Sequence, residues 1–304
     1  MSMWVDQLKR VLIGTLAVSG VFLLICSQNA QAEKKLAVFV SIAPQKYFVQ
    51  QIGQERVDVQ VMVQSGASPA TYEPKPRQLA AISKTPIYFA IGVPFEKKWL
   101  KKITAASPNM RVVHTDHGIQ KIPMAAHHHE AEHHRDKDHQ NRGELDPHIW
   151  LSPPVVMIQA RTIRDALQEI DPAHRSGYDT NYKAFVSKLA DLDAELRNTF
   201  AGRQGLQFMV FHPSWGYFAH TYGLKQVPVE IEGKDPKPAQ LKELIEHAKK
   251  NQIKIIFLQP QFSSKSAKLV AKEIGGQVAF ADPLAQNWSD NLREVTQKLD
   301  EALK

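Results

Sequence analysis

The stretch "DPAHRSGYDTNYKAFVSKLADLDAELRNTF", residues 171–200, predicts one long helix. Asp171 and Pro172 form a helix-start signal at its beginning. Five apolar side chains then recur at spacings of 4, 3, 4 and 4 residues, which places them on one face of a helix. These five are Phe185, Leu189, Leu192, Leu196 and Phe200. A helix of this length suits a spine between two lobes better than a connector inside a single lobe.

On both sides of this helix, apolar strand-like runs alternate with amphipathic helix-like runs. The runs before it are strands at 35–41, 57–63, 85–92 and around 112–114, and a helix at 152–170. The runs after it are strands at 205–211, 253–259 and 277–281, and helices at 235–252, 266–276 and 290–304. This alternation predicts an α/β fold with two lobes, each built on a mostly parallel sheet flanked by helices.

The first 32 residues have the layout of a secretory signal peptide. Lys9 and Arg10 precede an apolar run, and Ala30 and Ala32 offer an A-x-A cleavage site. The apolar run is shorter than the roughly 20 residues that a membrane-spanning helix needs. We therefore expect export to the periplasm with cleavage after Ala32, and keep an uncleaved anchor as the alternative.

Cys26 is the only cysteine, and it lies inside this leader. Lipoprotein anchoring through Cys26 is the weaker interpretation, because bulky Ile25 stands where a small residue is needed. Cleavage after Ala32 leaves a mature chain that cannot form a disulfide, so its stability must come from core burial, which its length permits.

The composition is that of an ordinary globular protein, with 43% hydrophobic and 23% charged residues. The formal charge of +7 comes from cations spread along the chain, without an Arg-rich run or zinc-knuckle spacing. We therefore expect no nucleic-acid partner.

Three possible metal ligands follow strand-like runs, where open α/β sheets hold their ligands. His212 directly follows one run, Asp282 follows another, and His148 lies beyond the fourth run of the first half. Taken singly, each histidine is more often structural, and Asp282 could simply cap the next segment. Two imidazoles and a carboxylate together suit Zn²⁺.

A histidine-rich tract precedes His148 and reads "HHHEAEHHRDKDHQNRGELDPHIW" from His127 to Trp150. Its six histidines are His127, His128, His129, His133, His134 and His139. The segment 125–142 has no apolar periodicity, so we expect a loop that cannot bury itself. We interpret it as an auxiliary metal-capture loop separate from the main site; the alternative is a solvated loop without a role.

Five stretches, in order along the chain, carry a resemblance to a known family. They are "GASPATYEPKPRQL", "DPHIWLSP", "FHPSWGYFAHTYGL", "EGKDPKPAQLKELIEHAKKNQIKIIFLQPQFS" and "ADPLA". The chain resembles the zinc- and manganese-binding solute-binding proteins of metal-uptake ABC transporters. The resemblance implies two four-stranded lobes joined by a long rigid helix, with the metal held between them. It also implies delivery of Zn²⁺, or alternatively Mn²⁺ or iron, to a membrane permease by a non-enzymatic monomer; a zinc buffer without a transporter is a further alternative.

The same resemblance implies three metal ligands, His148, His212 and Asp282, with His212 favouring zinc. The family's first ligand is the histidine of a "PHxYEP" pattern, and Ala70 stands at that position in "SPATYEP". We consider three accounts, in this order: water occupies the vacant position, a tract histidine completes the shell, or the site has drifted to another metal or to weak binding. Nearby Glu73 is interpreted as structural. A hydrolase would need a general base beside the metal-bound water, and no H-E-x-x-H motif supplies one.

These observations predict four segments. They are a signal peptide at 1–32, a first α/β lobe at 33–170 that includes the loop at 125–142, a linking helix at 171–202 and a second α/β lobe at 203–304.

Overall fold

The computed structural model describes residues 34–125 and 144–302, apart from residues 232 and 264. The segment Leu36–Lys304 forms one compact unit. The predicted leader, with Cys26 and Ala32, and the six tract histidines lie outside the described residues. Among the helices that are described, none is long and apolar enough to cross a membrane.

The first lobe is built on a parallel sheet of four strands in the order β2-β1-β3-β4. The strands are β1 (Leu36–Val40), β2 (Val57–Val61), β3 (Ile87–Ala90) and β4 (Arg111–His114). All four residues of the inner strand β3, "IYFA", are buried, as expected for a parallel sheet covered on both faces. The four strands predicted in this half of the sequence are confirmed.

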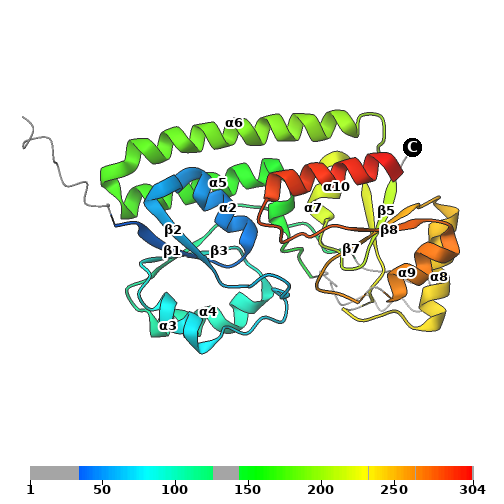
Figure 1. Cartoon of the computed structure of the whole chain (residues 1–304), viewed down its shortest axis with the longest axis horizontal. Coiled ribbons are helices and arrows are strands. Elements are labelled where there is room, and N and C mark those ends of the chain that lie inside the picture. The colour runs from blue at the N-terminus through cyan, green and yellow to red at the C-terminus, as the bar shows by residue number, and fades with distance from the viewer. Residues whose placement is uncertain (1–33, 126–143, 232, 264, 303–304) are drawn as a thin grey trace, which may run out of the picture. The chain divides into compact units, whose positions relative to one another are not determined.

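Helices cover both faces of this sheet (Figure 1). They are α2 (Ala43–Gly53), the short 3₁₀ helix η1 (Gln54–Arg56), α3 (Pro76–Ile82) and α4 (Pro94–Ala106). Helix α2 packs against α5 (Pro153–Ile170) and α6 (Arg175–Thr199), whereas α3 and α4 lie on the other side of the sheet. Proline in the first turn starts each of the three α-helices, since its fixed φ suits that position and its missing N–H is not needed there.

The predicted long helix is confirmed as α6 (Arg175–Thr199), which has 25 residues. It follows η2 (Ile149–Leu151), α5 (Pro153–Ile170) and η3 (Pro172–His174). The predicted apolar stripe of α6 is buried. The helix begins four residues after Asp171, because the segment Pro172–His174 forms a separate 3₁₀ turn.

The second lobe repeats the topology of the first, with a parallel sheet in the order β6-β5-β7-β8. Its strands are β5 (Gln207–Val210), β6 (Lys225–Pro228), β7 (Ile255–Leu258) and β8 (Gln277–Phe280). Its helices are α7 (Gly216–Tyr222), α8 (Pro238–Lys250), α9 (Lys265–Ile274) and α10 (Trp288–Ala302). The expected fold class, two parallel four-stranded α/β lobes joined by a long helix, is therefore confirmed.

The last helix fastens the second lobe to the first. The Trp288 ring at the start of α10 lies edge-on to Phe48 of α2, with ring centroids 5.1 Å apart, and Tyr47 donates a hydrogen bond to Ser289 at 3.3 Å. One hydrophobic cluster consequently runs through both lobes, and a second fills the outer face of the β5–β8 sheet. The two sheets therefore share one hydrophobic core.

Candidate metal centre

His148 is held by the buried side chain of Asp146 in the first lobe. Asp146 Oδ1 accepts the backbone N–H of His148 at 2.8 Å and lies 2.7 Å from its ring nitrogen Nδ1. An ionised carboxylate can only accept a hydrogen bond, so the ring nitrogen that faces it, Nδ1, carries the proton. The other ring nitrogen, Nε2, then keeps a free lone pair. The sequence "DPH" therefore caps the turn and also aims the imidazole.

Tyr217 of the second lobe steadies the same segment. Its hydroxyl accepts the N–H of Ile122 at 3.1 Å and donates to the carbonyl of Asp146 at 3.4 Å. Burial raises the pKa of Tyr217 to about 12, so the hydroxyl keeps its proton near neutral pH and remains a donor. The backbone that carries Asp146 is thus tied to both lobes.

His212 is held in the second lobe in the same manner. Its Nδ1 lies 2.7 Å from Glu230 Oε1, and Glu230 is only 7% exposed. Gln259 fixes the backbone of His212, accepting its N–H at 3.2 Å and donating to its carbonyl at 2.6 Å. The ring also stacks on Phe262 with centroids 5.3 Å apart. Nε2 is again the nitrogen with a free lone pair.

The two imidazoles meet although they come from different lobes. The ring centroids of His148 and His212 are 5.3 Å apart and their planes are inclined by 71°. Both rings line a cavity of about 770 Å³. Imidazoles held by carboxylates at Nδ1 are a common arrangement around protein-bound metals, because the carboxylate fixes the tautomer and makes Nε2 more basic. This pair can bind a borderline divalent cation such as Zn²⁺.

Asp146 and Glu230 cannot bind the same ion as the rings they orient. Each carboxylate contacts its ring at Nδ1, whereas the free lone pair is on Nε2. Among the described residues, the second oxygens Asp146 Oδ2 and Glu230 Oε2 are buried without a hydrogen-bond partner. The imidazole is therefore the main polar partner of each carboxylate.

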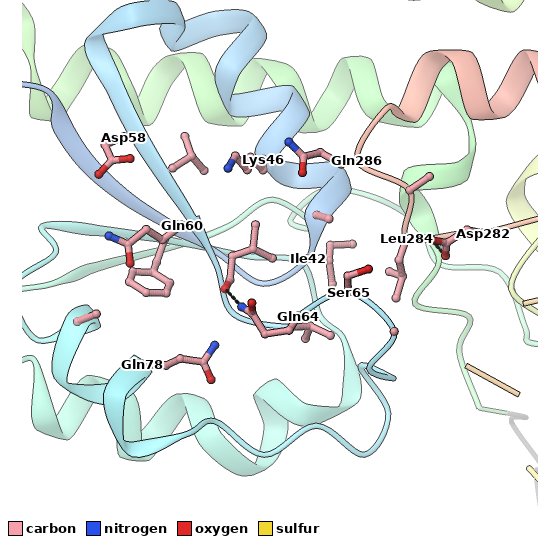
Figure 2. Close-up of a pocket in the computed structure, with 18 of the residues that line it drawn as sticks. Ile42, Lys46, Asp58, Gln60, Gln64, Ser65, Gln78, Asp282, Leu284 and Gln286 are labelled. Carbon is pink, nitrogen blue, oxygen red and sulfur yellow. Dashed lines mark hydrogen bonds between the residues drawn. The ribbon is translucent and has the colours of Figure 1, made fainter. Parts of the chain in front are cut away.

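Asp282 lies two residues beyond β8, at the predicted strand end, but faces a different cavity. It lines a cavity of about 650 Å³ together with Ser65 and Lys46, and neither histidine lines that cavity. Figure 2 shows Asp282 and Leu284 at one end of it, away from Asp58. Asp282 Oδ1 accepts the backbone N–H of Leu284 at 2.9 Å, which agrees with the alternative capping interpretation.

The backbone beside Asp282 is nevertheless attached to the segment of His148. Trp150 Nε1 donates to the carbonyl of Pro283 at 2.6 Å, and Trp288 Nε1 donates to the carbonyl of Trp150 at 2.7 Å. Leu284 lines both cavities and so lies between them. In the part of the chain that the structure describes, no group of three or more His, Cys, Asp or Glu side chains could hold a metal ion. The structure thus brings together two of the three predicted ligands.

Ala70 faces the cavity of the two histidines, at the position where the resemblance implies a further ligand. Its methyl group has no lone pair. Neighbouring Glu73 does not line this cavity; it forms an ion pair with Lys98, and the hydrogen bond from Lys98 lowers the pKa of the Glu73 carboxyl. The interpretation of Glu73 as structural stays a prediction.

The described residues next to the histidine-rich tract lie at the same cavity. Met124, Ala125 and Glu144 line it, and the backbone N–H of Met124 donates to the carbonyl of Glu144 at 2.8 Å. The described ends of the chain on either side of the tract therefore line the same cavity as the two imidazoles.

Sequence reasoning missed the role of Glu230. Glu230 lies two residues beyond β6, just as His212 and Asp282 lie two residues beyond β5 and β8. The expectation that functional residues follow the ends of strands would have selected Glu230 if the short strand β6 had been recognised.

Two α/β lobes that each bring one imidazole to a shared cavity are typical of a solute-binding protein of the two-lobe class. The chain belongs to the family ZnuA, zinc-uptake complex component A periplasmic, whose model matches residues 38–302. This is a family of metal-binding transport proteins rather than an enzyme class.

Known members agree with this assignment. A solved structure of a 138–173 deletion mutant of ZnuA with zinc bound is 42% identical, with a TM-score of 0.80, and the match covers 88% of this chain and 98% of that one. The high-affinity zinc uptake system protein ZnuA of Bacillus subtilis is 28% identical over 283 residues, which is 89% of this chain and 88% of the relative. The zinc-binding lipoprotein AdcA of Streptococcus pneumoniae is also 28% identical, over 91% of this chain. The match covers 56% of AdcA, so the chain spans about half the length of that relative.

The contact between Gly216 and Asp146 gives a first prediction. A Cβ added at Gly216 would lie 2.3 Å from Asp146 Oδ2, so Gly216→Ala should displace the carboxylate that orients His148. We expect metal affinity to fall roughly tenfold and the free energy of unfolding to fall by about 1–3 kcal/mol, measured by metal titration and urea unfolding. The matched control is Gly177→Ala in α6, where an added Cβ has nothing within 4 Å. Equal behaviour of the two variants would refute the proposed role of this contact.

Proposed function

We propose that this protein captures Zn²⁺ between its two lobes and delivers it to the membrane permease of a metal ABC transporter. The observation that carries the proposal is the pair of imidazoles, one from each lobe, with ring centroids 5.3 Å apart and both Nδ1 atoms on buried carboxylates. Family membership and the zinc-bound relative support it.

The proposed ligands are Nε2 of His148, Nε2 of His212 and the carboxylate of Asp282. Asp282 now faces the neighbouring cavity, so the proposal requires its side chain to turn past Leu284 when the ion binds. The hydrogen bond from Trp150 to Pro283 keeps the Asp282 backbone close to His148. Three protein ligands with an open fourth position are a common arrangement for zinc.

The decisive experiment is the metal content of the natively purified protein, followed by equilibrium affinities for Zn²⁺ and Mn²⁺. We expect bound zinc and a dissociation constant in the nanomolar range, equivalent to about 12 kcal/mol of binding free energy. Tighter binding of Mn²⁺, or no tight binding of either ion, would contradict the proposal. The first result would favour the manganese alternative and the second a drifted site.

We also propose that the chain is an exported monomer that loses residues 1–32. Attachment to a lipid through Cys26 is the weaker alternative. The segments of the chain are a first lobe at 33–170, a linking helix at 171–202 and a second lobe at 203–304. The six tract histidines form an auxiliary capture loop, which the cavity position of Met124 and Glu144 supports.

Restoring the missing histidine tests which group completes the metal shell. If water occupies the fourth position, Ala70→His should tighten zinc binding by roughly tenfold or more, because a protein ligand replaces an exchangeable one. The comparison is Ala70→Phe, which adds a ring of similar size without a lone pair and should not tighten binding. An unchanged affinity in competition titrations of Ala70→His would mean that another group, such as a tract histidine, already fills the position.

A further inference from the structure

The charged residues of the helices are divided unevenly between two sides of the fold. Helices α3, α4, α8 and α9 together carry eleven Lys and Arg residues against four acidic residues. Helices α6 and α10 carry six against eight. Figure 1 shows α6 and α10 along the top of the view, α3 and α4 below the first sheet, and α8 and α9 at the lower right. We call the Lys and Arg side chains of α3, α4, α8 and α9 the basic face.

Helix α4 has the densest charge of this face. Lys97, Lys98, Lys101 and Lys102 are all exposed, and their i,i+4 spacing sets like charges side by side. The only acid of α4, Glu96, is buried at 4% exposure, and its carboxylate accepts hydrogen bonds from the backbone N–H groups of Ile91 and Gly92. It therefore neutralises little of the surface charge.

Two of the four lysines of α4 contact neighbouring side chains, and two do not form an ion pair within the described part of the chain. Lys98 pairs with Glu73, and the ammonium of Lys102 lies 4.6 Å from the centroid of the Trp99 ring. Lys97 and Lys101 form no ion pair with any residue that the structure describes. Neighbouring lysines on α4 repel one another, and an anionic partner would reduce this repulsion.

The residue types of the basic face favour a membrane surface over a protein surface. Ten of its eleven cations are lysines. Lysine is a flexible, strongly hydrated point charge that is depleted in protein–protein interfaces, whereas arginine is enriched there. The apolar residues Phe95 and Ile103 of α4 are buried inward, and Trp99 and Leu100 are only partly exposed. The helix therefore presents mainly charge to a surface. We propose that the basic face binds electrostatically to the anionic phospholipid headgroups of a bilayer.

The basic face adjoins the cavity of the two histidines. Pro94, the first residue of α4, and Gln240, in the first turn of α8, both line that cavity. Adsorption through this face would therefore hold the cavity mouth near the bilayer. The inference goes beyond metal capture, because it concerns a lipid surface and residues that do not line the metal cavity.

Sedimentation with lipid vesicles tests the proposal. The chain from residue 33, which contains the compact unit, is mixed with vesicles of phosphatidylcholine alone or with 30% phosphatidylglycerol, at low and at 300 mM salt. We expect binding to the anionic vesicles only, with loss at high salt because exposed charges are screened. The triple variant Lys97→Gln, Lys101→Gln, Lys102→Gln should bind roughly tenfold or more weakly, with its zinc affinity unchanged.

The matched control removes the same charge from the other side of the molecule. Arg175, Lys183 and Lys188 are exposed residues of α6, and their triple replacement by Gln should change vesicle binding less than twofold. Absence of wild-type binding to anionic vesicles at low salt would overturn the proposal and leave an acidic protein surface as the partner. An equal loss in both triple variants would also overturn it, because net charge alone would then explain binding.

Discussion

Replacement of His212 by alanine should weaken zinc binding by about a thousandfold. The change removes one of two imidazoles whose centroids are 5.3 Å apart. Loss of a ligand should lower the affinity more than loss of a residue that only hydrogen-bonds to a ligand, which typically costs roughly 10- to 100-fold. It also leaves the buried Glu230 without its imidazole, so the free energy of unfolding should fall by about 1–3 kcal/mol. Competition with a chromophoric chelator measures the affinity, and urea unfolding measures the stability.

The control for this prediction is another histidine of the same region. His220 is exposed on α7, eight residues further along the chain, and His220→Ala should leave the tightest zinc site unchanged. If His212→Ala bound zinc as tightly as the wild type, the main site would have to lie elsewhere, and the histidine-rich tract would be the first place to look.

The second large effect is expected at Glu230, which is not one of the proposed ligands. Glu230→Gln keeps the shape of the side chain but removes its charge, and it places an amide where Oε2 is buried without a partner. We expect zinc affinity to fall roughly 10- to 100-fold. Nitrogen NMR of the metal-free protein should show His212 protonated at Nδ1 in the wild type and as a mixture of tautomers in the variant.

This NMR readout separates orientation from simple destabilisation. Glu73→Gln is the comparison, since Glu73 is exposed and paired with Lys98 outside the metal cavity. It should change neither the tautomer nor the zinc affinity. A Glu230→Gln protein with a fixed Nδ1 tautomer and unchanged affinity would show that the carboxylate only fills space.

Much of the fold could be predicted because its periodicities are strong. The apolar stripe of α6 spans many turns, and β3 and β7 are runs of buried residues. Strand β6, "KQVP", was not predicted because it has four residues, begins with an exposed lysine and ends in proline. It lies at the edge of its sheet, where a strand is less completely buried and tolerates proline, so its hydrophobic pattern in the sequence is weak.

The site was predictable to the extent that strand ends determine it. His212 was selected because it directly follows a strand, and His148 because it lies beyond the tract after the fourth strand. The structure brings the two rings together edge to face. The direction of a side chain depends on tertiary contacts that sequence spacing does not contain. Asp282 is the example, because its hydrogen bond to the Leu284 backbone and its place beside Ser65 follow from how the loop folds.

In the proposed function a single ion joins the two lobes through His148 and His212. Anomalous X-ray scattering at the zinc edge, on crystals of the protein grown with zinc, would locate this ion. We expect one strong peak about 2.0–2.1 Å from Nε2 of both histidines, with the Asp282 carboxylate turned toward it. A peak away from these two nitrogens, or imidazoles that remain without an ion in saturating zinc, would contradict it.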